Sequence, residues 1–168
     1  MAVADDLDHA TDSTDPQWEW VGEQTRTYLD SGGTEGHESN GVHTLILATT
    51  GRRTGLPRRT CLIYGTSGDD FVVVASKGGA DEDPAWFKNL VAEPSVGVQA
   101  GTRRFTARAR VASPAEREAL WPRMAAIFPL YDEYARKTER VIPLVLLTPR
   151  DRPSRDGRHV MDLTAKGD

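Results

Sequence analysis

The chain has 168 residues and a formal net charge of −4, which fit a single domain and give no reason to expect nucleic-acid binding. No apolar run approaches the roughly 20 residues of a membrane span, and the acidic N-terminus is unlike a signal peptide, so we expect a cytoplasmic protein without a transmembrane segment. The single cysteine, Cys61, excludes an internal disulfide.

The predicted elements begin with a disordered acidic tail over residues 1–14, because residues 1–16 contain five Asp, no Lys or Arg and no apolar periodicity. A helix follows, with Asp15 as its cap and Pro16 in its first turn, and it ends at Gly32-Gly33. Residues 43–50, 58–64 and 71–75 predict three strands, and the short turns between them make neighbouring strands antiparallel.

The second half of the chain predicts a helix over 85–92, a hairpin of strands 96–100 and 104–111, and a helix from a capping box at Ser113 and Glu116 to about residue 128. A short helix over 130–138, a last strand over 143–148 and a polar tail over 150–168 follow. Six strands with tight turns predict an α+β protein, namely a closed or partly open antiparallel barrel with helices outside, in one domain over residues 15–149.

Most catalytic motifs are absent from the sequence. There is no Gly-rich dinucleotide or P-loop motif and no nucleophile elbow. The four histidines lack metal-ligand spacing, so we expect no metal, and Cys61 fits a buried thiol better than a nucleophile. These gaps favour a binding protein or chemistry performed by a cofactor.

Two basic loops and a group of aromatic residues are the positive signals. Residues 39–68 contain four arginines and no acid, around the turn 51–55, and residues 76–80 (SKGGA) follow a buried strand. Arginine forks, Lys77 and backbone amides can converge on a phosphate or carboxylate. Taken alone, the arginine turn is better explained by surface arginines, and an ordinary strand-to-helix loop explains residues 76–80 at least as well. Trp86, Tyr131 and Tyr134 could line a flat ligand, or pack in the core.

The motifs around these residues resemble the deazaflavin-dependent nitroreductase and quinone reductase family of actinobacterial type. The resemblance covers about residues 40–149, through LILATTGRRTGLPRRTCLIYG, VVVASKGGADEDPAWFKNLVAEPSVGVQ, and a W-P…F-P-x-Y-x-x-Y…T-x-R-x-I-P pattern from Trp121 to Pro143. It implies an FMN-binding-like split β-barrel that binds coenzyme F420 (an 8-hydroxy-5-deazaflavin) and transfers a hydride from its reduced form to a quinone or nitroaromatic acceptor. Phe128 stands where the family often has Tyr.

The resemblance also implies which residues form the site. The implied catalytic residues are Tyr131, Tyr134 and Ser76. The implied cofactor-binding residues are Arg52, Arg53, Thr54, Arg58, Thr60, Cys61, Ser76, Lys77, Gly78, Gly79, Ala85, Trp86, Asn89 and Tyr131. Two alternatives stay open, namely an FMN-dependent reductase on the same barrel and a deazaflavin carrier without turnover. We expect a small-molecule acceptor, no nucleic-acid partner and a monomer.

Overall fold

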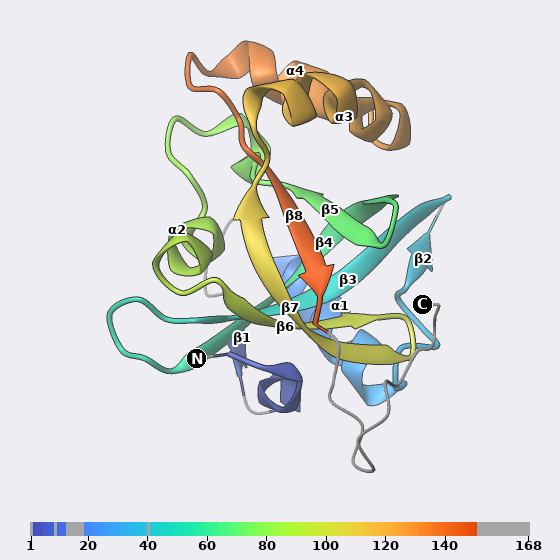
Figure 1. The fold of residues 1–168 in the computed structure, drawn as a ribbon. Coiled ribbons are helices and arrows are strands. Elements are labelled where there is room, and N and C mark those ends of the chain that lie inside the picture. Colours follow the sequence, from blue (N-terminus) through green and yellow to red (C-terminus); the bar gives the residue numbers. More distant parts are fainter. Residues whose placement is uncertain (1, 9, 13–18, 40, 151–168) are drawn as a thin grey trace.

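Six antiparallel strands close into a barrel in the computed structural model, which describes residues 2–8, 10–12, 19–39 and 41–150 (Figure 1). The strands run β3-β4-β5-β8-β7-β6 and return to β3. Their bounds are β3 (Val42–Thr50), β4 (Pro57–Ser67), β5 (Asp70–Val74), β6 (Ser95–Ala100), β7 (Arg103–Val111) and β8 (Leu144–Pro149). The predicted antiparallel barrel of about six strands is therefore confirmed, with each strand within a few residues of its expected position.

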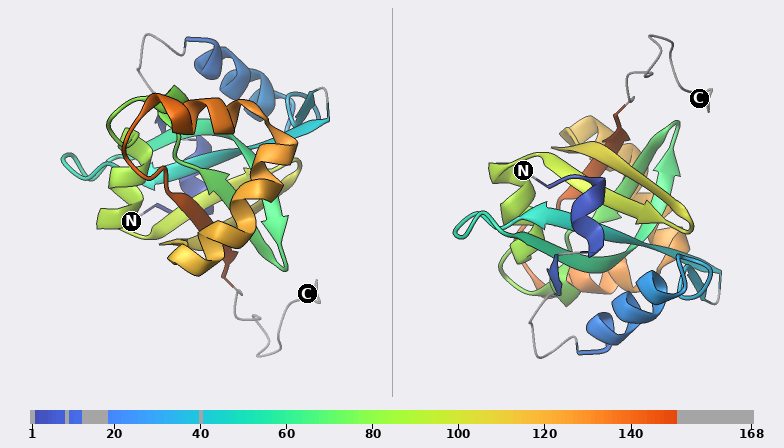
Figure 2. Two further views of the ribbon diagram at one scale, coloured as in Figure 1. Left: turned by 90° about the horizontal axis from the view of Figure 1, so that it is seen from above. Right: turned by 90° about the horizontal axis from the view of Figure 1, so that it is seen from below.

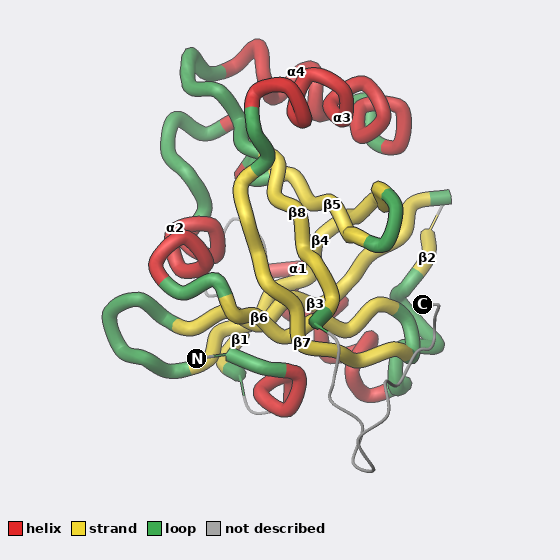
Figure 3. Tube along the Cα trace, in the orientation of Figure 1, coloured by secondary structure: helices red, strands yellow, loops and turns green. Residues whose placement is uncertain are grey.

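Alternating side chains divide each strand between the barrel interior and an outer layer. On β5, Phe71 and Val73 belong to the interior cluster, whereas Val72 and Val74 face the helices α3 (Pro114–Ile127) and α4 (Leu130–Lys137). Figure 3 shows the strands around one interior with the helices outside it. The helix α2 (Ala85–Ala92) contributes Leu90 to the interior, so it helps to close one end of the barrel.

The helix α1 (Glu19–Asp30) lies against the outer side of β3 and β4, and its predicted start at Asp15 and Pro16 is outside the described residues. The Tyr28 hydroxyl anchors it, because this group donates to the Thr44 carbonyl oxygen at 2.8 Å and accepts from the Gly101 amide at 2.6 Å. Within the described residues, no helix has the length and apolar character needed to cross a membrane.

The described part of the N-terminal segment is folded, which corrects the expectation of a disordered tail over residues 1–14. A 3-10 helix, η1 (Ala4–Asp8), crosses the sheet in the view from below (Figure 2), and β1 (Thr11–Asp12) pairs in parallel with β4. A Cβ on Gly97 of β6 would lie 2.3 Å from the Val3 carbonyl oxygen, so this glycine allows the close crossing. A second short strand, β2 (Glu38–Ser39), pairs with β3 and was also not expected.

Two contacts explain why this acidic segment is folded. Leu7 is fully buried beside Tyr28 and Cys61. Arg104 holds both carboxylate oxygens of Asp8, at 2.8 and 2.9 Å. The buried apolar side chain contributes most toward offsetting the entropy lost when the segment is ordered, and the ion pair, in which Asp8 is 57% exposed, adds a smaller contribution.

Candidate functional site

The turn between β3 and β4 carries the predicted arginines and is fixed to α2 by Asn89. The Asn89 Oδ1 atom accepts from the Arg52 backbone amide at 3.1 Å and from Arg52 Nη1 at 3.0 Å. Its Nδ2 atom donates to Thr49 Oγ1 at 3.2 Å. Asn89 is 5% exposed, so its amide is occupied by the protein itself. The structure therefore gives Asn89 a positioning contact with the arginine turn.

Two guanidinium groups of this segment are available to a ligand. Arg53 is exposed and Arg58 is half-buried at the start of β4. Within the described part of the chain, neither guanidinium group forms a hydrogen bond or an ion pair. Thr54, at the same turn, uses Oγ1 to accept from the Leu56 amide at 3.1 Å, which stabilises the turn. An anion placed here would meet cations that have no competing partner in the part of the chain that the structure describes.

Strand alternation separates the other predicted residues of β4. Arg58 and Thr60 lie on the face shared by Leu62 and Tyr64, which pack toward the barrel interior. Cys61 lies on the opposite face and packs in the outer cluster that α1 and η1 cover. Burial raises the pKa of the Cys61 thiol to about 11. The structure thus does not bring the Cys61 side chain to Arg58 and Thr60, and only its backbone could contact a ligand there.

The loop after β5 contains three successive residues with left-handed backbone. Lys77, Gly78 and Gly79 have φ values of 46°, 63° and 87°, within the short 3-10 turn η3 (Lys77–Gly79). A Cβ on Gly79 would lie 2.9 Å from the Tyr134 carbonyl oxygen, so only glycine allows the loop to meet α4 this closely. Because β3, β4 and β5 are paired antiparallel in turn, the end of β5 lies at the same end of the barrel as the start of β4, so this loop and the arginine turn share that end.

Arg140 holds this loop in place, and the sequence reasoning gave it no role. Its Nε atom donates to the Ala80 carbonyl oxygen at 2.7 Å, and Nη2 donates to the carbonyl oxygens of Ser76 at 2.9 Å and Ala75 at 3.2 Å. Its Nη1 atom pairs with Asp83 at 2.9 Å, and the side chain is 15% exposed. The only sequence signal for this contact is the arginine of the T-x-R-x-I-P pattern.

The predicted lysine of the loop has a weak partner. Lys77 Nζ contacts Glu82 Oε1 at 2.5 Å, and this contact lowers the pKa of the Glu82 carboxyl group. The Glu82 side chain is 64% exposed. Because solvent-exposed ion pairs contribute little stability, a phosphate could replace Glu82 as the partner of Lys77 at small cost.

The predicted aromatic residues occupy different environments. Tyr131 is 5% exposed in the cluster between α3, α4 and the barrel, and burial raises the pKa of its hydroxyl. Tyr134 is half-buried, with its ring centroid 6.4 Å from that of Tyr131, and its backbone touches Gly79. Trp86 packs against the interior cluster, whereas Ala85 is exposed at the start of α2. The structure therefore places Tyr134 nearest the glycine loop.

Taken together, the arginine turn, the glycine loop and α2 lie at the same end of the barrel. This end carries the guanidinium groups of Arg53 and Arg58 and the ammonium group of Lys77, a set of cations whose chemistry suits an anionic group. Among the described residues, no group of three or more His, Cys, Asp or Glu side chains is arranged to hold a metal ion.

Comparisons with known proteins agree with one another. The family model described as F420H(2)-dependent quinone reductase matches residues 20–149. An F420H(2)-dependent quinone reductase of Mycobacterium tuberculosis is 36% identical over 132 residues, which cover 73% of this chain and 85% of the relative. A second, putative F420H(2)-dependent quinone reductase of the same species is 39% identical over 109 residues, covering 65% of this chain and 92% of the relative.

Two solved structures are similar at 34% identity. One, described as a domain-swapped dimer, has a TM-score of 0.61 and covers 79% of this chain and 99% of its own. The other, an F420-H2 dependent reductase (FDR-A), has a TM-score of 0.58 and covers 62% of this chain and 92% of its own. With the match over residues 20–149, these likenesses establish that the chain belongs to the F420H(2)-dependent quinone reductase family.

Proposed function

We propose that this protein transfers a hydride from reduced coenzyme F420 to an electron-poor acceptor of the quinone class, with nitroaromatic compounds as a second acceptor class. The observation that supports it most is that the guanidinium groups of Arg53 and Arg58, which have no partner within the described residues, share one end of the barrel with the left-handed loop at Lys77. Coenzyme F420 carries a phosphate and an acidic tail, which suit this cationic end of the barrel. The family match names F420, so the FMN alternative is not needed.

The residues present fit this cofactor. Arg53, Arg58 and Lys77 would hold the phosphate and the acidic tail, while the backbone of Gly78 and Gly79 allows close approach. A supporting set would shape the site around them, namely Arg52, Thr54, Thr60, the backbone of Cys61, Ser76, Ala85, Trp86 and Asn89. When bound, the deazaflavin supplies the hydride.

The protein's own contribution to the reaction is position and charge. Asn89 and Arg140 fix the two loops, so that the cationic groups are in place before the ligand arrives. The buried layer of α3 and α4 excludes water from the outer face of β5. Ser76, Tyr131 and Tyr134 stay candidates for contact with the reacting atoms, and Tyr134 is favoured because it is half-buried and touches Gly79.

A titration of the purified protein with F420 and with FMN tests the cofactor assignment. We expect tighter binding of F420, and a loss of at least about tenfold in F420 affinity in the double variant Arg58→Ala, Lys77→Ala, with a larger loss at low salt. Arg108→Ala, an exposed arginine on β7, is the matched control and should bind normally. Tighter binding of FMN, or unchanged F420 affinity in the double variant, would overturn the assignment.

Turnover separates a reductase from a carrier. We expect oxidation of reduced F420 only when menadione or a nitroaromatic compound is present, and a complete lack of acceptor-dependent oxidation would favour the carrier. The cytoplasmic location and the monomeric state remain proposals. Size-exclusion chromatography with light scattering tests the second, because one similar structure is described as a domain-swapped dimer.

A further inference from the structure

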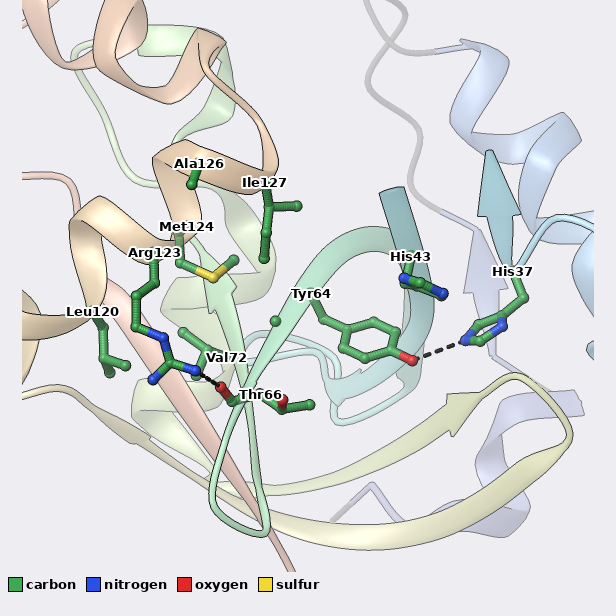
Figure 4. A pocket seen from close by; sticks show the side chains of 11 residues that line it. His37, His43, Tyr64, Thr66, Val72, Leu120, Arg123, Met124, Ala126 and Ile127 are labelled. Carbon is green, nitrogen blue, oxygen red and sulfur yellow. Dashed lines mark hydrogen bonds between the residues drawn. The ribbon is translucent and has the colours of Figure 1, made fainter. Parts of the chain in front are cut away.

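A groove of about 600 Å³ lies outside the cationic end of the barrel, between α3 and the rim formed by β3 and β4. Figure 4 shows Arg123, Met124 and Ile127 of α3 on one side of it and His37, His43 and Tyr64 on the other. This volume falls within the roughly 300–1,000 Å³ typical of small-molecule sites. The mixture of apolar walls with a few polar groups is also typical of such sites.

Two side chains of the groove form a polar pair. The Tyr64 hydroxyl and His37 Nε2 lie 2.8 Å apart in hydrogen-bonding contact, with the two rings stacked at a centroid distance of 5.9 Å. Burial and the neighbouring His43 lower the pKa of His37, which favours a neutral imidazole. In the tautomer that carries its proton on Nε2, His37 donates to Tyr64 and leaves the phenol hydrogen free for another acceptor.

The groove borders the buried layer that covers β5. Val72 and Met124 line the groove and also belong to the buried cluster that contains Tyr131. Val72 precedes Ser76 by four residues on β5 and the loop after it, a distance of about 13 Å at about 3.3 Å per residue. A cofactor held by its phosphate near Lys77 would have to span about this distance to bring its ring system to the wall of the groove at Val72.

On this basis we propose that the groove binds the electron acceptor, a planar quinone-type carbonyl compound, and that the Tyr64 hydroxyl, backed by His37, gives the acceptor its proton. The inference rests on the proposed function for its hydride donor. It places the acceptor against residues outside α4. It also gives a direct role to Tyr64 and His37, a pair that the family resemblance did not indicate.

Tyr64, His37 and water supply every proton that the reduction of the acceptor requires. The hydride brings the acceptor two electrons and one hydrogen, so a quinone needs one further proton to become a hydroquinone. The Tyr64 O–H bond breaks as a new O–H bond forms on the acceptor oxygen. His37 Nε2 then returns a proton to the tyrosinate, while Nδ1 of the half-buried imidazole takes one from water. No further oxidant or reductant is required.

Binding of menadione to the full-length protein without cofactor tests the inference without turnover. We expect menadione to shift the imidazole NMR signals of His37 and His43, assigned with the variants His37→Asn and His43→Asn. Tyr64→Phe removes one hydrogen bond and should weaken menadione binding about fivefold. In turnover it should lower kcat by about a hundredfold or more, as for the loss of a general acid.

A steric variant keeps the test independent of the hydrogen bond. Ala126 lines the groove and is exposed on α3, so Ala126→Trp should fill the groove and weaken menadione binding by more than tenfold. Ala119→Trp, at an exposed position of the same helix outside the groove, should bind menadione as the wild type does. F420 affinity should be unchanged in Tyr64→Phe and Ala126→Trp.

Each outcome distinguishes the inference from the proposed function. Wild-type menadione affinity in both Tyr64→Phe and Ala126→Trp, with F420 still bound, would overturn the acceptor site alone. If only Ala126→Trp weakens binding, the groove stands and the role of Tyr64 is wrong. If the wild-type protein fails to bind F420, the proposed function fails whatever menadione does.

Discussion

Replacing Arg140 by lysine should loosen the loop that carries Lys77. The arginine fork makes three hydrogen bonds to backbone carbonyl oxygens and one to Asp83, at 2.7–3.2 Å. A lysine keeps the charge but cannot reproduce the planar fork, and hydrogen bonds to a charged group contribute about 1.5–3 kcal/mol each. With part of the contacts regained by the ammonium group, we expect a net loss of about 2 kcal/mol, or about 6 °C in Tm.

The effect on ligand binding should be separate from the effect on stability. We expect F420 affinity in Arg140→Lys to fall about tenfold, because ordering the loosened loop would cost binding free energy. Arg136→Lys is the matched control, since Arg136 is exposed on α4 and should change neither quantity. Differential scanning calorimetry gives Tm, and fluorescence titration gives the affinity. Unchanged Tm in Arg140→Lys would refute the reasoning about the fork, and a lower Tm with full affinity would show that binding does not need this loop geometry.

Two further predictions concern the backbone and the buried thiol. Gly79→Ala and Gly68→Ala both place a Cβ at positive φ, which costs about 1 kcal/mol each. Only the Cβ at position 79 also overlaps Tyr134, so urea unfolding should show Gly79→Ala to be at least about 2 kcal/mol less stable than Gly68→Ala. Equal free energies of unfolding would contradict the close contact. Because burial raises the pKa of Cys61 to about 11, the native protein at pH 8 should react with a thiol reagent at least about a hundredfold more slowly than the urea-unfolded chain. Deletion of residues 1–12 should speed the reaction of the native protein, because it uncovers Cys61.

The barrel could be predicted because its signals are local. The capping box is one example, since Ser113 Oγ accepts from the Glu116 amide at 3.2 Å and the Glu116 carboxylate accepts from the Ser113 amide at 2.9 Å. The tight turns are another, because a short glycine-bearing turn between two apolar runs leaves antiparallel pairing as the only geometry. The bounds of the strands follow from such patterns within a few residues, whereas the pairing of β5 with β8 and of β6 with β3 joins strands that are remote in sequence.

The N-terminal segment could not be predicted, because its stabilising partners are remote in sequence. Within residues 1–14, Leu7 is the only large apolar residue besides Val3 and Met1, so no periodicity marks a helix. The energy that folds it comes from a site on the barrel that buries Leu7 and from Arg104, which lies 96 residues after Asp8. Local composition therefore indicated disorder where long-range contacts give structure.

The candidate site was predictable in its residue types and less so in their roles. Motifs identified the arginine turn and the glycine loop, but they do not show that Asn89 is occupied by Arg52 and Thr49. The sequence showed Arg140 only as the arginine of the T-x-R-x-I-P pattern. Its positioning role could not be predicted, because its hydrogen bonds reach residues about 60 positions earlier in the chain. Positioning residues of this kind act between elements, and a linear sequence does not reveal which elements meet.

Strand alternation explains how two adjacent arginines, Arg58 and Arg59, come to differ in their contacts. Arg59 points to the outer face of β4, where its Nη1 atom donates to the Leu7 carbonyl oxygen at 2.7 Å and so holds η1. Arg58 points to the other face and keeps its guanidinium free of partners among the described residues. The acidic N-terminus therefore satisfies cations on the outer surface, at Arg59 through its backbone and at Arg104 through Asp8. Among the described residues, Arg53 and Arg58 have no such acidic partner, so their charge is open to an anionic cofactor although the whole chain is acidic.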